Sequence, residues 1–130
     1  MKDFFKEIFI YHHHFNQLLV EEVRIHKHAL TEDTYKMFCH LLNAHQVWNS
    51  RVLSEPSLKV WELHEPEELK ALDTKNYEDT LRILDKTDLD AVISYTNSRG
   101  EAYTNAVKDI LFHITTILPI TRASLPQLFV

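Results

Sequence analysis

Apolar side chains recur every three or four residues over long stretches of this chain, which is the spacing of one face of an α-helix. The first stretch runs from Lys2 to about Ile25, and its stripe consists of Phe5, Ile8, His12, Phe15, Leu19 and Val23. The second begins after a predicted N-cap at Thr31 and ends at about Leu53. Its stripe consists of Phe38, Leu41, His45, Trp48 and Val52. We therefore expect two long helices in the first half of the chain.

The second half has shorter patterned segments. Residues 57–65 are expected to be irregular or extended, and Pro66 is well placed to begin a short helix to about Leu72. A third main helix is predicted to start near Lys75 or Asn76. It would turn three apolar side chains inward, namely Tyr77, Leu81 and Leu84.

A short strand and a fourth helix complete the prediction. Leu89 to Thr96 resembles a strand, and the turn residues Asn97 to Gly100 follow it. The fourth helix is expected to carry Tyr103, Val107, Ile110, Ile114 and Ile117 at spacings of 4, 3, 4 and 3. Four amphipathic helices of similar length predict an all-α fold, an antiparallel four-helix bundle with a short extended or hairpin segment near residues 89–101.

The composition supports a helical domain and excludes several classes of function. With 130 residues the chain is predicted to form one domain, and its single glycine, Gly100, excludes the glycine-rich loops that bind phosphates. The net charge of −5 gives no basic surface for nucleic acid, and no apolar run reaches the ~18 residues of a membrane span. The charged N-terminal residues are not expected to form a signal peptide. One cysteine, Cys39, excludes an internal disulfide and is typical of a reducing cytoplasm.

The chain contains nine histidines, and two of them interrupt apolar stripes. His45 lies between Leu41 and Trp48, and His12 occupies the equivalent place in the first helix. Two imidazoles that point into one interior can form a metal or acid–base site. A core imidazole can equally be structural and hydrogen-bond a buried carbonyl or hydroxyl. His13 and His14 are expected to be half-exposed, Cys39 to be a buried inert thiol, and no role is assigned to His26, His28 and His64.

The segments from Phe38 to Arg51, Tyr95 to Gly100 and Asp109 to Ile114 resemble the DinB/YfiT-like family of metal-dependent enzymes. The resemblance extends over nearly the whole chain. It implies a four-helix bundle with a three-histidine site for zinc or nickel, and an activity such as thiol S-transfer. His45 matches the ligand of the second helix. The other two ligands would be a His-x-x-x-His pair on the fourth helix.

That pair is missing here, because aligning on His113 places the two expected ligands at Ile117 and Thr121. Neither side chain suits a metal ion that prefers nitrogen or sulfur. The stretch Thr115 to Thr121 can be back-translated so that the frame one base earlier encodes Asn-His-Ser-Thr-His-His. Residues 116–130 are therefore either an out-of-frame C-terminus or part of a genuine divergent member without a metal.

Two functional hypotheses follow from the sequence. The first is a DinB-like metal-dependent enzyme, a thiol S-transferase or hydrolase, that keeps only His45 as a metal ligand and is weak or inactive as written. Its metal would be zinc or nickel, if any binds, and its substrate a small thiol. The second is a non-catalytic helical module that forms a homodimer. Phe4, Phe9, Leu18 and Val20 favour it, because they widen the apolar stripe of the first helix.

Overall fold

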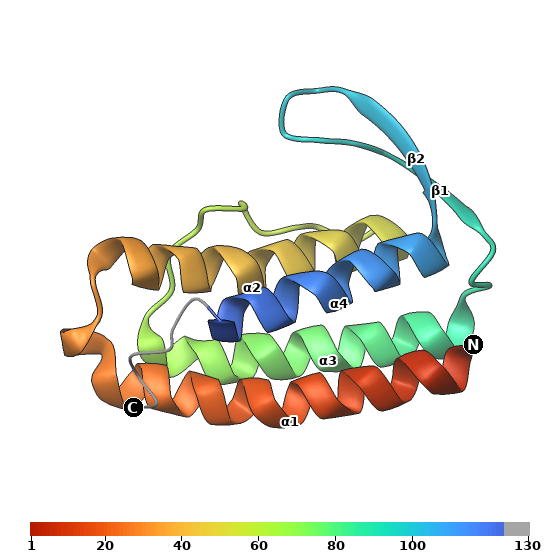
Figure 1. The fold of residues 1–130 in the computed structure, drawn as a ribbon. Coiled ribbons are helices and arrows are strands. Elements are labelled where there is room, and N and C mark those ends of the chain that lie inside the picture. Colours follow the sequence, from red (N-terminus) through yellow and green to blue (C-terminus); the bar gives the residue numbers. More distant parts are fainter. Residues whose placement is uncertain (124–130) are drawn as a thin grey trace.

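The computed structural model describes the backbone of residues 1–123 and the side chains of residues 1–117. Over this part the chain is mostly helical, with four α-helices and one two-stranded antiparallel sheet (Figure 1). The helices are α1 (Lys2–His26), α2 (Glu32–Leu53), α3 (Leu69–Lys86) and α4 (Val107–Ala123). Two short 3₁₀ helices cover Lys27–Ala29 and Pro66–Glu68, and the strands are β1 (Val92–Thr96) and β2 (Ala102–Ala106).

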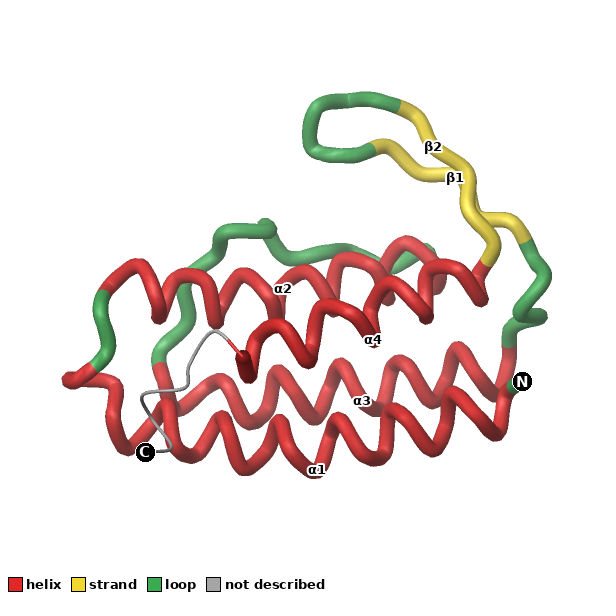
Figure 2. Tube along the Cα trace, viewed as in Figure 1, coloured by secondary structure: helices red, strands yellow, loops and turns green. Residues whose placement is uncertain are grey.

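The four helices lie side by side, and the two strands rise from one end as a hairpin (Figures 1 and 2). Helix α1 contacts α3 and α4, and α2 contacts the same two helices. Strand β1 lies against α2, and β2 continues into α4. None of the helices in the described part of the chain is long and apolar enough to cross a membrane.

The apolar core is split into two clusters. The cluster nearer the hairpin consists of Phe5, Phe9, Ile83, Leu84, Leu89, Val107, Ile110, Leu111 and Ile114. The cluster at the opposite end consists of Leu19, Val20, Val23, Tyr35, Phe38, Cys39, Leu42 and Leu69. The residues of α1, α2 and α3 between the clusters are buried but polar, and we call them the polar belt: His12, Asn16, His45, Asn49, Asp73, Asn76 and Thr80.

The buried face of α1 differs in part from the predicted stripe. Phe9 and Asn16 are buried, whereas Phe15 is 37% exposed. Helix α1 has α3 and α4 as neighbours, so its buried face is wide and centred away from Phe15. Phe9 and Val20 were assigned to the flank of the stripe, where they would widen it for a partner, and that assignment was wrong, because both lie in the core.

Local signals fix the ends of α2 as predicted. The Thr31 hydroxyl accepts a hydrogen bond from the backbone N–H of Thr34 at 3.1 Å, which confirms the predicted N-cap. At the other end the helix stops at Leu53, and Ser54 adopts a left-handed conformation with φ of 56°. Pro56 then prevents the helix from continuing.

Helix α3 starts earlier than predicted. Pro66 opens a 3₁₀ turn, and the α-helix runs without a break from Leu69. A break was expected between about Leu72 and Lys75, where Asp73 and Thr74 are poor helix formers. Asp73 directs its carboxylate to α1 instead of its own backbone, so it does not compete with the helix.

The hairpin is longer than predicted and replaces the expected first turn of the fourth helix. Tyr103 lies in β2 opposite Tyr95, and α4 begins only at Val107. Tyr103 was assigned to the helix because it lies four residues before Val107, which is a helical spacing. The turn was located correctly: Asn97 Oδ1 accepts from the backbone N–H of Arg99 and Glu101, and Gly100 has φ of 79°.

The backbone of α4 continues through Pro119 to Ala123. The out-of-frame hypothesis for residues 116–130 concerns the gene and stays a prediction. Residues 124–130 of that segment lie outside the described part of the chain.

Candidate functional site

His45 lies in the middle of α2, where the stripe predicted it, and it faces α3. Its side chain is buried, and its Nε2 atom lies 2.9 Å from Oγ1 of Thr80. Thr80 has one hydroxyl proton, and the carbonyl oxygen of Asn76, 2.8 Å away, can only accept it. The opposite tautomer would also leave a buried Nδ1–H of His45 without an acceptor among the described residues, so the ring proton is assigned to Nε2 and Thr80 Oγ1 accepts it.

This tautomer leaves the Nδ1 atom of His45 with a bare lone pair. Nδ1 is buried and has no hydrogen-bond partner within residues 1–117. Burial lowers the pKa of His45 to about 3, and repulsion from His12 adds to this effect. The imidazole is thus neutral near pH 7 with one open nitrogen, which is the state that a metal ligand or hydrogen-bond acceptor requires.

The structure brings His12 and His45 together, as the two interrupted stripes predicted. His12 is 5% exposed on α1, and both rings line one small cavity between α1, α2 and α3. The cavity has a volume of about 10 Å³, about the minimum that holds one water molecule. Its other lining residues are Phe9, His13, Asn16, Asp73 and Tyr77.

Asp73 is a buried acid of this region that the apolar pattern of the sequence did not indicate. Its carboxylate is almost fully buried and accepts hydrogen bonds from Asn16 Nδ2 at 3.1 Å and Gln17 Nε2 at 2.7 Å. The ring of His13 also contacts it, with Nδ1 at 3.0 Å from Oδ2. Burial raises the pKa of Asp73, while these polar contacts oppose the increase.

His13 is oriented from two sides. Asp73 holds its Nδ1 atom, and the ring lies parallel to that of Tyr77 with centroids 4.2 Å apart and planes at 5°. His13 is half-buried, as expected, whereas His14 is exposed. A carboxylate–imidazole pair of this kind fixes a ring for proton transfer or for metal ligation.

One signal in the sequence could have located the polar belt in α3. Asp73, Asn76 and Thr80 follow Leu69 at steps of 4, 3 and 4, which is the spacing of one helix face. Because these residues are polar, the apolar pattern pointed instead to Tyr77, Leu81 and Leu84. Of these three only Leu84 is fully buried.

Two further histidines form hydrogen bonds that hold the segment between α2 and α3 against α2. His40 Nδ1 lies 2.7 Å from the carbonyl oxygen of Val60. The His40 ring stacks on that of Trp61, with ring centroids 3.8 Å apart. His64 Nε2 lies 2.6 Å from Oδ1 of Asn43. No role was assigned to His64 from its position in the sequence, and the structure shows a structural one.

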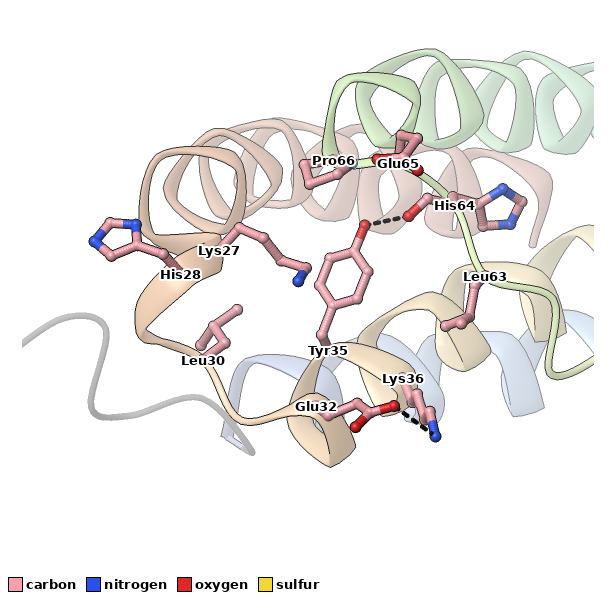
Figure 3. A pocket seen from close by; sticks show the side chains of 10 residues that line it. All are labelled: Lys27, His28, Leu30, Glu32, Tyr35, Lys36, Leu63, His64, Glu65 and Pro66. Carbon is pink, nitrogen blue, oxygen red and sulfur yellow. Dashed lines mark hydrogen bonds and ion pairs between the residues drawn. The ribbon is translucent and has the colours of Figure 1, made fainter.

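A surface pocket of about 470 Å³ lies at the end of the helices opposite the hairpin (Figure 3). The Tyr35 hydroxyl donates a hydrogen bond to the backbone carbonyl of His64, and the Lys27 ammonium lies 4.5 Å above the Tyr35 ring. Cys39, whose thiol interacts with Tyr35, is fully buried, and burial raises the pKa of this thiol. The prediction of a buried thiol at Cys39 is confirmed.

The described donors do not form a complete metal site. Within the part of the chain that the structure describes, no three histidine, cysteine, aspartate or glutamate side chains are placed to hold one ion. Ile117, one of the two expected ligand positions, is partly buried, and the side chain of Thr121 lies outside the described residues. His45 as a metal ligand therefore stays a prediction.

No family model, no curated protein and no solved structure matches this chain. The DinB/YfiT-like resemblance stays a prediction that depends on the sequence segments quoted above.

Proposed function

We propose that this chain is a DinB-like four-helix bundle that retains one imidazole of a divalent-metal centre, His45. In this form it would hold zinc or nickel weakly and act slowly or not at all on a small thiol substrate. One observation carries the proposal: the neutral ring of His45 has an open, buried Nδ1 atom beside a second imidazole, that of His12. The single buried thiol, Cys39, supports a reducing cytoplasm as the compartment.

The donor chemistry explains why such a chain would be weak. Catalytic zinc needs three protein ligands to remain bound while a fourth position stays open. His45 supplies one nitrogen, and the resemblance places the other two ligands at Ile117 and Thr121. The residues present in the described part of the chain do not fit a tightly bound ion.

Metal titration of the wild-type chain and of a restored chain tests this proposal. After chelator treatment, equilibrium dialysis against zinc or nickel should give less than one ion per wild-type chain. The double variant Ile117→His with Thr121→His should bind about one ion, because it restores the predicted nitrogen donors. Adding His45→Ala to this double variant should weaken binding by at least about a factor of ten, since even loss of an outer partner of a ligand costs about 10–100-fold.

His28→Ala, at an exposed histidine, is the matched control and should leave binding by the double variant unchanged. Tight stoichiometric metal in the wild-type chain would contradict the proposal, because its ligands would lie elsewhere. A double variant that folds but binds no metal would contradict it too, because His45 would then not be a retained ligand.

A second candidate function is a non-catalytic module that pairs with another copy of itself. The outer face of α1 favours it, because large apolar side chains there recur at steps of three, four and seven residues. They are Phe4, Tyr11, Phe15, Leu18 and Ile25, which are 49%, 55%, 37%, 54% and 49% exposed. An exposed apolar stripe on a 25-residue helix is large enough to contribute to a helix–helix interface.

Sedimentation equilibrium separates the two candidates. A homodimer should appear in the wild-type protein and be weakened by Leu18→Glu, which places a charge in the middle of the stripe. Lys6→Glu, at an exposed position on the same helix, should leave the dimer intact. A wild-type protein that remains monomeric at the highest attainable concentration would exclude this second candidate.

A further inference from the structure

Arg51 lies in the last turn of α2, beside strand β1, in a corner formed by two aromatic rings. Its guanidinium carbon is 4.5 Å from the ring centroid of Trp48 and 4.5 Å from that of Tyr95. The two rings are 5.2 Å apart, and their planes meet at 79°. The guanidinium therefore has an aromatic ring on each of two sides, and the Arg51 side chain is partly exposed.

The hydrogen-bonding capacity of Arg51 is unused within the described residues. Arg24 binds Glu21, and Arg82 binds Glu55 and Asp79. Arg51 has no ion pair and no hydrogen bond to any side chain or backbone group of residues 1–117, although its guanidinium carries five N–H donors.

Arg51 is also partly desolvated. Burial lowers its pKa, and the phenol of Tyr95 opposes this effect; among residues 1–117 no carboxylate forms an ion pair with the guanidinium. A guanidinium in such a place is a strong donor toward an oxyanion, because charge-assisted hydrogen bonds gain strength when water is partly excluded.

Further aromatic rings from the hairpin and from α4 pack against the two rings of the corner. The Tyr95 hydroxyl donates to Oδ1 of Asn105 at 2.6 Å, which fixes that ring, and Tyr103 stacks on Tyr95 at 6.0 Å. On the other side His113 lies against Trp48 with ring centroids 5.3 Å apart. A shallow depression of about 540 Å³ on the hairpin has Tyr95 and Tyr103 in its lining.

We propose that Arg51, Trp48 and Tyr95 form a binding site for a small organic carboxylate with a planar apolar body. The carboxylate would accept two hydrogen bonds from the guanidinium, a geometry that arginine offers and lysine does not. The apolar body would lie against the rings of the corner, because small-molecule sites combine aromatic walls with a few polar anchors. This site does not depend on the role of His45.

An NMR titration with benzoate tests the proposal. The chain has two tryptophans, so a ¹⁵N-labelled sample gives two indole N–H signals, and Trp61→Phe assigns them. Benzoate at constant ionic strength should shift the Trp48 signal saturably and leave that of Trp61 unmoved. Benzyl alcohol, which has the same ring without the charge, should shift neither signal saturably.

Substitutions of Arg51 then separate binding from a purely structural role. Arg51→Gln should weaken benzoate binding by about ten- to a hundredfold, the range for loss of a hydrogen bond to a charged group. Arg51→Lys keeps a cation against both rings but lacks the planar pair of donors, so its hairpin signals should stay in place while benzoate binding falls. Arg99→Gln, at the exposed turn of the hairpin, is the matched control and should bind benzoate like the wild type.

Three results would overturn the proposal. The first is the absence of a saturable shift at Trp48 in the wild-type protein, which requires no variant. The second is unchanged benzoate binding in Arg51→Lys and Arg51→Gln. The third is a response to inorganic phosphate as strong as that to benzoate, because the site would then recognise charge alone.

Discussion

The buried imidazole of His45 makes the stability of this fold depend on pH. Its pKa is about 3 in the folded protein and 6.5 in the unfolded chain. Below pH 6.5 the unfolded chain takes up a proton that the folded protein does not accept until about pH 3, so acid favours unfolding. The contribution of neutral His45 is therefore fully present above pH 6.5 and is lost progressively as the pH falls toward 3.

The size of the effect follows from the two pKa values. Each pH unit between them corresponds to about 1.4 kcal/mol. At pH 5 the loss is about 2 kcal/mol, and near pH 3 it approaches about 5 kcal/mol. A single-domain protein has a total stability of only about 5–15 kcal/mol, so the loss at pH 5 is large enough to measure.

Urea unfolding at pH 7.5 and pH 5 measures this loss in the wild-type protein and in His45→Gln. Glutamine does not titrate, and its amide can still donate to Thr80. The wild-type protein should lose about 2 kcal/mol more than the variant over this interval. All other histidines are present in both proteins.

His28→Gln, at an exposed position, is the control and should show the same pH dependence as the wild type. If the wild type and His45→Gln lose the same free energy of unfolding between pH 7.5 and pH 5, the assignment of a neutral buried ring is refuted. If His45→Gln does not fold, NMR titration of the His45 ring in the wild-type protein decides the question. A midpoint near 6.5 would contradict the reasoning.

Three further substitutions test the packing. Thr80→Val removes the acceptor for His45 and should cost about 1–3 kcal/mol in urea unfolding, whereas Thr80→Ser should recover most of this loss. Phe5→Ala should cost about 3–5 kcal/mol, because Phe5 is fully buried in the cluster near the hairpin, and Phe5→Leu should cost less. Thr31→Ala should cost about 1 kcal/mol by removing the α2 cap, with Thr31→Ser near wild type in the same assay.

The sequence predicts those parts of the fold whose signal is the spacing of apolar residues or a local cap. The N-cap at Thr31 and the turn at Gly100 were predicted because each depends on a few neighbouring residues. The second strand was missed because Tyr103 has helical spacing to Val107, whereas its pairing with Tyr95 depends on contacts between strands.

The candidate site was predicted only in part, for a similar reason. His45 and His12 could be found because each interrupts an apolar stripe. Asp73 and Thr80 could not, because a polar residue on α3 looks the same in the sequence whether it faces water or a buried partner. The aromatic corner around Arg51 could not be predicted either, because one of its two rings belongs to Tyr95, more than forty positions away in the sequence.

The polar belt also determines how α2 and α3 align along their length. Asn76 Nδ2 donates to the carbonyl oxygen of Leu42, and Asn49 Nδ2 donates to that of Asn76, so these bonds join the helices at fixed heights. Sliding one helix by a single turn, about 5.4 Å, would leave several buried polar groups unpaired, each at about 1–3 kcal/mol. Purely apolar faces would tolerate such a slip. Misaligned collapsed forms of this chain are therefore poor competitors of the native state during folding.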